Sequence, residues 1–400
     1  MRASRLLHFS PLFLALAASG LARAADGDSL RLNAGIGWHH DDNLLRVADN
    51  DPGFGGQRDD NWRQLDAGAS FDQMVGRQRI QASVQLSKVN FDYFSQLDYD
   101  GKDARATWNW QLGNQFEGKI GASYMQVLAP YTDLRSSERN LRVQHSTFAD
   151  GAWRLHPSWR LRAGVAEDRY SYELLSQLPN NRRERAVESG IDYLVASGSE
   201  IGLNVRRLEG RYSYRRPLAL ATDDFGQNEY RLRINWLASA QATVNLLAGW
   251  TARSQNAFGP GRVNGVTGRL AVTYAASAKT SFDAALWRDF APIESNVVSY
   301  TLNRGASVTA NWQPTAKVRV GANASAEQRD YSARNALPVS VRGLDLNDSL
   351  RTAGLNLTYT PSRKVQFGAT VARQVRGGSR VLGIGAFRST SIGINASIAF

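Results

Sequence analysis

The chain of 400 residues contains no cysteine at all. Disulfides, zinc–thiolate sites and cysteine nucleophiles are therefore excluded, and stability has to come from hydrogen bonding and packing. Lysine is also scarce, since only 6 of the 48 basic residues are lysines and 42 are arginines. Arginine carries a planar, permanently charged fork that suits carboxylate and phosphate partners.

Long apolar runs are missing beyond the N-terminus, where none approaches the roughly 18 residues that a membrane-spanning helix needs. An inner-membrane helical protein is therefore excluded. The N-terminus itself has the order of a secretory signal peptide. It combines Arg2 and Arg5, an apolar stretch from Leu6 to Leu21, and the A-x-A site Ala22-Arg23-Ala24. We expect residues 1–24 to be removed and the mature chain to begin near Ala25.

The formal charge is +12, and loss of the expected signal peptide with its three arginines leaves +9. A DNA-binding protein could share this bias, but an exported chain argues against a nucleic-acid partner. Lipopolysaccharide phosphate, an anionic polysaccharide and acidic residues of the chain itself are the expected counter-charges. No linker, low-complexity tract or shift in composition marks a boundary, so we expect residues 25–400 to form a single domain.

The last ten residues alternate strictly between apolar and small or polar side chains. Ile392, Ile394, Ala396, Ile398 and Phe400 share one parity. A period of two predicts an extended strand with one apolar and one wet face. A final strand that ends on an aromatic residue is typical of bacterial outer-membrane barrels, in which that strand closes the barrel and is recognised by the assembly machinery. A soluble sandwich is the alternative.

Aromatic residues recur just before short polar turns along the whole chain. The repeat occurs at Trp110, Trp153, Tyr193, Trp236, Tyr274, Trp312 and Tyr359. Gly, Pro, Ser and Asn supply the backbone angles of such turns. Aromatic residues at this spacing predict a belt at one membrane interface, whereas core aromatics of a soluble β protein are the alternative.

Longer segments rich in Asp, Asn, Gly and Arg alternate with the short turns, at 40–60, 128–137, 213–224 and 335–347. This alternation predicts an all-β, antiparallel up-and-down transmembrane barrel in the outer membrane, with both termini on the periplasmic side. About 18 strands are expected, and 16 remain possible. The expected strands lie near 28–39, 61–75, 79–93, 102–112, 116–127, 138–154, 159–172, 182–195, 200–212, 225–238, 241–254, 263–275, 279–290, 297–312, 317–331, 347–360, 364–376 and 385–400.

The second parity of these strands is polar and charged, which predicts a wet lumen. Basic residues expected on the lumen side are Arg105, Lys119, Arg142, Arg160, Arg162, Arg206, Arg231, Arg233, Arg269 and Arg319. Such a row could pass a polyanion along or select anions. Inward acidic residues could equally pair with them and stiffen the wall, so both interpretations stay open. The acidic set is Asp66, Asp72, Glu117, Asp150, Glu188, Asp192, Glu229 and Asp283.

A short motif follows the first expected strand, His39-His40-Asp41-Asp42-Asn43-Leu44-Leu45-Arg46. Asp41, Asp42, Asn43 and Arg46 resemble the D-[DS]-N-[LI]-[FL]-R signature of the outer-membrane β-barrel porin-2 group. Within that group the chain is most similar to EpsL-type proteins, encoded with exopolysaccharide systems of the exosortase-associated kind. The resemblance implies an outer-membrane protein that helps to export a polysaccharide, and it gives no catalytic residues to carry over to this chain. The motif itself could bind sugar or a cation, or it could be ordinary turn chemistry that shapes the first loop at the barrel rim.

Enzymatic signals are weak in this sequence, and we expect neither catalysis nor a cofactor. No G-x-S-x-G is present. The pair His145-Ser146 invites comparison with barrel phospholipases, but no acyl-transfer constellation surrounds it. His39, His40 and Asp41 have metal-ligand types, yet neighbours in a strand point to opposite faces. No metal site is therefore expected.

Two functions fit these observations, namely a conduit or guide for an exported extracellular polysaccharide and a general diffusion porin with mild anion preference. A diffusion porin narrows its lumen with a long inward-folded loop. The third external segment, 128–137, is short, which favours export. Expected partners are outer-membrane lipid and lipopolysaccharide, the barrel assembly machinery, an anionic polysaccharide and periplasmic secretion components. A plugged structural or adhesion barrel would need a plug segment, and none is evident outside these loops.

Overall fold

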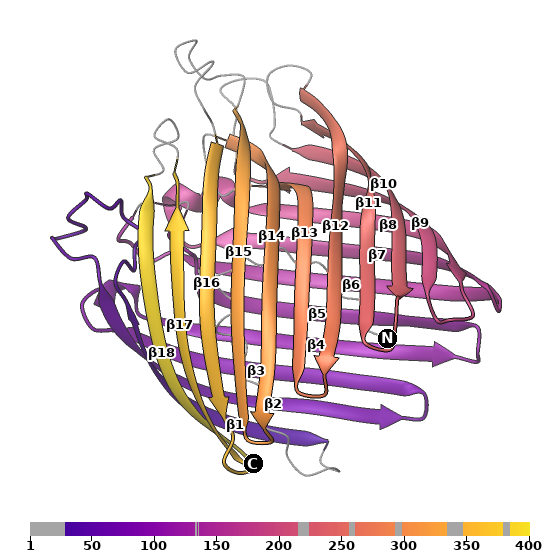
Figure 1. Cartoon of the computed structure of the whole chain (residues 1–400). Helices are drawn as coiled ribbons and strands as arrows, with labels where there is room; N and C mark the ends of the chain where they lie inside the picture. Colours follow the sequence, from indigo (N-terminus) through magenta and orange to yellow (C-terminus); the bar gives the residue numbers. More distant parts are fainter. Residues whose placement is uncertain are drawn as a thin grey trace.

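The computed structural model describes residues 29–400 except 133, 135, 215–223, 256–260, 293–297, 334–346 and 379–384. The expected signal peptide and much of the expected loops at 213–224 and 335–347 lie outside the described residues. Eighteen strands form one antiparallel sheet, and β1 pairs with both β2 and β18, so the sheet closes into a barrel (Figure 1). The predicted eighteen-stranded barrel is confirmed, and the sixteen-stranded alternative is wrong.

Every expected strand boundary lies within three residues of the observed one, so the alternation located the hairpins correctly. The strands are β1 (Leu30–Asp41), β2 (Asp60–Val75), β3 (Gln78–Phe91), β4 (Tyr99–Leu112), β5 (Phe116–Leu128), β6 (Leu141–His156), β7 (Trp159–Tyr172), β8 (Arg182–Leu194), β9 (Glu200–Tyr212), β10 (Phe225–Leu237), β11 (Ala242–Gln255), β12 (Gly261–Ser277), β13 (Thr280–Pro292), β14 (Val298–Thr315), β15 (Val318–Ala333), β16 (Asn347–Tyr359), β17 (Val365–Arg376) and β18 (Phe387–Ala399).

Two short 3-10 turns, η2 (Ser95–Leu97) and η3 (Leu175–Asn180), interrupt the loops. No helix in the described part of the chain is long and apolar enough to cross a membrane.

The barrel closes between the first and last strands, from the pair Asn33 and Ala399 to the pair Asp41 and Ser391. Phe400 extends this ladder, because its backbone N–H donates to the Leu32 carbonyl at 2.8 Å and its carbonyl accepts from the Leu32 N–H at 3.3 Å. The described chain therefore starts and finishes at the end of the barrel that carries the short turns. We call this the short-turn end, and the opposite end the long-loop end.

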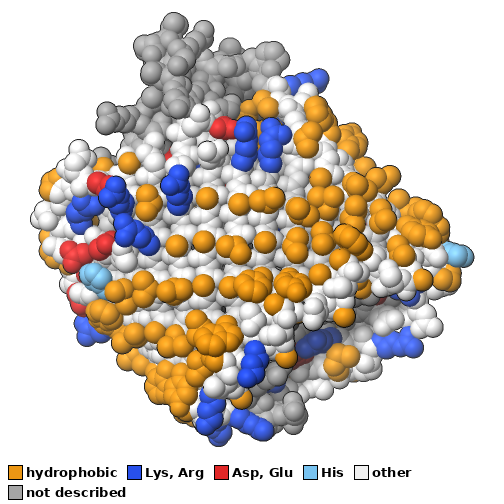
Figure 2. All heavy atoms as spheres, in the orientation of Figure 1, with side chains coloured by type: hydrophobic (Ala, Val, Ile, Leu, Met, Phe, Trp, Pro, Cys, Tyr) orange, Lys and Arg blue, Asp and Glu red, His pale blue; other side chains and the backbone are white. Residues whose placement is uncertain are grey.

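The outer surface is apolar along most of each strand. Leu355 is 61 % exposed and Leu203 is 62 % exposed, although both are large hydrophobic residues in the middle of strands. Figure 2 shows apolar side chains in rows across the visible face, with basic side chains both above and below this apolar band. Burial by lipid, not by protein, is the environment that such a surface requires.

The aromatic residues predicted to form a belt do gather at the short-turn end on the outside. Trp236 and Trp312 remain more than half exposed there. Trp110 instead lies flat over Gly118 and Gly151, where an added Cβ would come within 2.5 and 3.6 Å of its ring. Rings also meet across strands, as Trp159 meets Tyr193 and Phe116 meets Trp153. The prediction of a girdle is therefore confirmed in its geometry.

Candidate functional site

Strand alternation divides the side chains of the barrel into an outward and an inward set. On β10, Tyr230 and Trp236 are 56 % and 54 % exposed on the outside, whereas Glu229, directly before Tyr230 in the strand, is 3 % exposed. Neighbouring strands keep this parity, because Tyr230 pairs with Val205 and with Trp250 in the register. The inward set is the candidate site, since it lines whatever passes through the barrel.

Charged residues concentrate on one wall of the lumen, around a buried aspartate. Asp192 on β8 is fully buried and accepts hydrogen bonds from Arg160 Nη2 at 2.9 Å and Arg162 Nε at 2.6 Å. Glu200 on β9 joins the same network, accepting from Arg160 at 2.8 Å and from Arg233 at 2.6 Å. Three arginines from β7 and β10 thus share two carboxylates from β8 and β9.

A second group continues the wall toward the long-loop end. Glu229 on β10 pairs with Arg206 on β9 at 3.1 Å and forms an ion pair with Arg231 on its own strand. Gln227 donates a further hydrogen bond to the Glu229 carboxylate at 2.5 Å. We call the two groups together the charged wall. Five of the ten predicted lumen cations meet here in ion pairs, which favours the interpretation as a stiffening network for these five.

The other predicted lumen cations do not converge. Among the described residues, Arg105 on β4 forms an ion pair with Asp103 two residues away, at 2.9 Å and with about half of its side chain exposed. Arg269 on β12 lies over the Trp287 ring, 5.4 Å from the ring centre. Lys119 and Arg319 form no ion pair among the described residues. Arg142 faces inward at the start of β6, half-buried and apart from the charged wall.

On the opposite wall of the lumen, asparagine side chains lie over glycines of neighbouring strands. The sequence analysis did not predict this feature. On the inner face of β15 to β18, each asparagine pairs in the register with a glycine of the next strand. An added Cβ on those glycines would come within 2.0 to 2.8 Å of the asparagine Oδ1, so each amide lies flat against the wall. The pairs are Asn323 with Gly354, Asn356 with Gly321 and Asn395 with Gly368.

The same arrangement extends across the closure of the barrel, where Gln85 on β3 lies over Gly68 on β2. Inward neighbours of these amides are serines and threonines, and we call this surface the amide wall. A signal for it is present in the sequence as a repeated G-x-N at inward parity. The copies are Gly321-Ala322-Asn323, Gly354-Leu355-Asn356 and Gly393-Ile394-Asn395.

The opening at the long-loop end is narrowed by three loops that pack against each other. Leu45 and Val47 of the β1–β2 loop, Phe94 of the β3–β4 loop and Tyr131 of the β5–β6 loop are all buried together. Their cluster rests on inward residues at the end of β3, notably Phe91. We call it the mouth cluster. A buried apolar group inside a wet lumen restricts the passage on this side.

The β5–β6 loop also reaches a distant wall. Arg376 at the end of β17 donates a hydrogen bond to the Thr132 carbonyl, while its Nε donates to Asp348 on β16 at 2.6 Å. The loop is further held to β7, because Arg139 pairs with Glu173 at 2.6 Å and keeps the pKa of that carboxyl below its usual range. Although short, this segment folds inward. The argument that its shortness favours export over a diffusion porin is therefore wrong.

The motif after β1 builds the first of these loops. Arg46 binds the Asp41 carboxylate through two nitrogens at 2.8 and 2.9 Å, and Asp41 also accepts from the Asn43 N–H at 2.9 Å. The Asn43 side chain donates to the Val47 and Arg388 carbonyls, both at 2.9 Å. Arg46 adopts a left-handed φ of 55°, which few non-glycine residues tolerate. These contacts support turn chemistry as the role of Asp41, Asn43 and Arg46.

Asp42 lies on the other face of the same turn, where its carboxylate accepts from the Thr390 N–H at 2.6 Å. It therefore ties the β1–β2 loop to β18 and completes the structural account of the motif.

The histidines do not form a catalytic or metal centre in the described part of the chain. His145 points outward against the Tyr124 ring, 4.8 Å between centres, whereas Ser146 points inward and hydrogen-bonds Asp168. Adjacent strand residues cannot converge, so the phospholipase comparison loses its basis. His39 stacks on Trp62 inside the barrel, and His40 bonds Asn61 at 3.0 Å. Among the residues that the structure describes, no group of three or more ligand side chains could hold a metal.

No protein-family model matches the chain, and no curated protein matches it in sequence. The resemblance of the motif to the porin-2 group thus has no further support. Among solved structures, the chain is similar to OccK2 (OpdF) of Pseudomonas aeruginosa, with a TM-score of 0.50, 13 % identity and coverage of 93 % of this chain and 98 % of that one. The outer membrane protein opdK of the same organism gives a TM-score of 0.47 at 12 % identity, covering 93 % and 99 %. At this identity the likeness to OccK2 establishes the fold alone: this chain is a closed β-barrel of the kind found in outer-membrane proteins.

Proposed function

We propose that this chain is an outer-membrane channel whose lumen guides an extracellular polysaccharide out of the cell. The observation that carries the proposal is the division of the lumen into an amide wall and a charged wall on opposite sides. Each amide offers both donors and acceptors, which matches the hydroxyl groups of sugars. Since the amides of Asn323, Asn356 and Asn395 lie flat, a chain of sugars meets a smooth polar surface with no deep binding pocket.

The charged wall suits the same role because its charges are largely compensated. Arg160 and Arg233 are held by Asp192 and Glu200, so they offer hydrogen bonds without a strong net field. Transport through a pore requires sites that bind enough to admit the cargo and weakly enough to release it. Paired arginines meet that requirement for neutral and mildly acidic sugars.

The proposed location is the outer membrane, with the short-turn end in the periplasm. The expected signal peptide, the apolar outer band and the aromatic girdle support this placement. It would put Phe400 and β18 where the assembly machinery acts, and the charged short turns where periplasmic secretion components could dock.

A general diffusion porin with mild anion preference is the second candidate, and one observation favours it. The β5–β6 loop folds inward and is tied across the lumen by Arg376, as a constriction would be. Such a loop suits small solutes better than a long polymer.

Permeation into liposomes separates the two candidates. Refolded protein would be reconstituted, and influx of a monosaccharide compared with influx of neutral linear oligosaccharides of increasing length. A polysaccharide guide predicts that long oligosaccharides still enter. Replacing Asn323, Asn356 and Asn395 together with Leu should slow their entry and leave monosaccharide entry unchanged. A sharp length cut-off, with no effect of the triple substitution, would favour the diffusion porin.

A further inference from the structure

The outer face of β14 to β17 changes from apolar to basic on the way to the long-loop end. On β16 the outward series runs from Leu355 through Ala353 to Arg351, and on β17 it runs from Val371 to Arg373. Both arginines are exposed and neither makes an ion pair within the described part of the chain. They stand where the apolar band ends, which is where a membrane-embedded surface meets lipid headgroups.

The two arginines are close neighbours across the β16–β17 ladder. Arg373 pairs in the register with Ala353, and Arg351 pairs with Val375. Diagonal neighbours of this kind lie roughly 7 Å apart on the same face, within reach of long side chains. Two guanidinium groups at that spacing can hold phosphate oxygens between them, and guanidinium–phosphate bonds are strong because they are charge-assisted.

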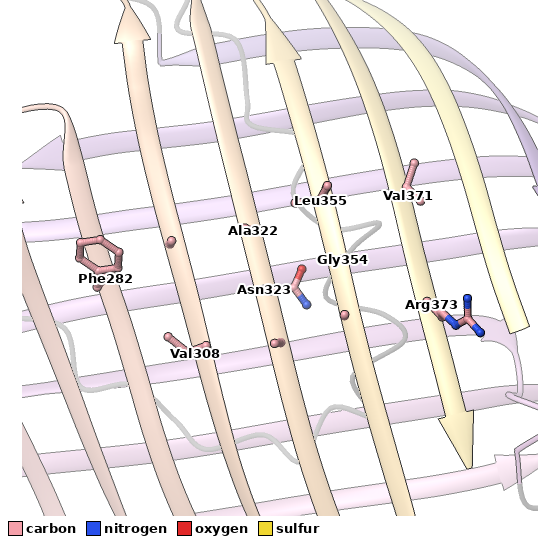
Figure 3. A pocket seen from close by; sticks show the side chains of 11 residues that line it. Phe282, Val308, Ala322, Asn323, Gly354, Leu355, Val371 and Arg373 are labelled. Atoms are coloured by element: carbon pink, nitrogen blue, oxygen red, sulfur yellow. The ribbon is translucent and has the colours of Figure 1, made fainter. Parts of the chain in front are cut away.

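An apolar groove begins beside Arg373 and runs over the same strands (Figure 3). It has a volume of about 420 Å³, and nine of its eleven lining residues belong to the outward-facing set. Alanines at 310, 322, 324 and 353 form its floor, and Phe282, Val308, Leu355 and Val371 form its sides. An acyl chain fits a groove of this kind, since it needs apolar contact along its length and no hydrogen bonds.

A second group of arginines on the outer face differs from Arg351 and Arg373, because its members form ion pairs. On β7 and β8, Glu167 binds Arg169 at 2.7 Å, Arg185 at 2.8 Å and Arg183 at 2.5 Å. On β9, Arg207 pairs with Glu209 at 2.9 Å. These arginines already have carboxylate partners, and none of them lines the apolar groove. At Arg351 and Arg373, by contrast, arginines that form no ion pair among the described residues stand beside an apolar groove.

We propose that Arg351, Arg373 and the adjoining groove form a specific site for a phosphorylated, multiply acylated lipid of the lipid A type. The phosphate lies between the two guanidinium groups, and one acyl chain lies along the alanine floor. The site is on the outer wall, so it does not depend on what passes through the lumen. It also fixes the orientation of the barrel, because it places the long-loop end in the leaflet that contains lipid A.

Native mass spectrometry of the refolded full chain in detergent tests this proposal, with bisphosphorylated hexa-acyl lipid A as the probe. Wild type should retain one lipid A per chain. The double substitution Arg351→Gln and Arg373→Gln should weaken retention about tenfold or more, the loss expected for charged hydrogen bonds. Ala324→Phe with Ala353→Phe, which fills the groove and keeps the charges, should weaken it as well.

A matched control is the double substitution Arg169→Gln and Arg207→Gln, which removes the same charge from paired arginines and should retain lipid A as wild type does. Heat-modifiable migration on a gel verifies that each variant is folded. Equal loss in the control would show that total charge, not this site, holds the lipid, and would overturn the proposal. Unchanged retention in the Arg351 and Arg373 variant would overturn it too. Displacement by millimolar inorganic phosphate would identify a simple anion site instead of a lipid site.

Discussion

Arg376 on β17 donates a hydrogen bond to the backbone carbonyl of Thr132, 244 residues earlier in the chain. Its guanidinium is also bound by Asp348 at 2.6 Å and by the Tyr331 hydroxyl at 3.1 Å, so it is fixed before it reaches the loop. Because its guanidinium is held in place, Arg376 fixes the β5–β6 loop through the Thr132 carbonyl. Arg376 therefore helps to position the β5–β6 loop at the long-loop end, together with the mouth cluster and the Arg139–Glu173 ion pair.

Replacing Arg376 with Gln should free the β5–β6 loop and increase single-channel conductance, because the loop no longer lies across the mouth. Arg207→Gln, on the outside of β9, should leave conductance at the wild-type value. Unchanged conductance in Arg376→Gln would mean that the mouth cluster alone positions the loop.

Asp192→Asn should lower the free energy of unfolding by about 3 kcal/mol, since it leaves buried Arg160 and partly buried Arg162 without their shared carboxylate. Asp103→Asn is the matched control on the same inner face. Its pair with Arg105 is largely exposed, so its loss should cost less than about 1 kcal/mol. Urea unfolding in lipid vesicles measures both, and equal effects would contradict the distinction between the buried network and a solvated pair.

Anion preference should depend on the unpaired lumen cations. Lys119→Gln with Arg319→Gln should move the reversal potential in a salt gradient toward zero without changing the urea midpoint. Arg231→Ser with Arg233→Ser should instead destabilise the barrel, because Glu229 and Glu200 lose partners. The charged wall, and not Lys119 and Arg319, would set selectivity if the Arg231 and Arg233 variant lost anion preference and the Lys119 and Arg319 variant kept it.

Deleting Phe400 should reduce the amount of assembled barrel in the membrane while barely altering the stability of the protein that does assemble. Residue 400 is 61 % exposed, and its backbone forms two hydrogen bonds to Leu32. Phe400→Tyr keeps a terminal aromatic and should assemble normally. Normal membrane levels of the deletion would rule out a recognition role for this residue.

The strands and their faces could be predicted because a barrel in lipid obeys a strict period of two. Trp236 and Glu229 were placed on opposite faces correctly from parity alone. Pairing within the lumen could not be predicted in this way. Asp192 meets Arg160 through the register of β7 with β8, and Arg233 through the registers of β8 with β9 and of β9 with β10. A register shift of two residues keeps every face but changes every partner.

The direction in which the loops fold could not be predicted from the sequence. The length of the β5–β6 segment indicated nothing about its direction, which depends on Tyr131 entering the mouth cluster and on Arg376 from a distant strand. The amide wall did leave a signal in the G-x-N repeat. Glycine near asparagine is also common in turns, so the repeat alone does not predict an amide wall. The strand register, which places Asn356 over Gly321, is needed to recognise it.

Single-channel recording of the refolded wild-type protein in planar bilayers tests the central claim most directly. With a neutral or mildly acidic linear oligosaccharide added on one side, we expect an open pore whose current is interrupted by brief, length-dependent blocks, because the sugar chain traverses the lumen along the amide wall. The Leu substitutions at Asn323, Asn356 and Asn395 should change the duration of these blocks. An open pore whose current no oligosaccharide interrupts would contradict a lumen built to guide polysaccharide.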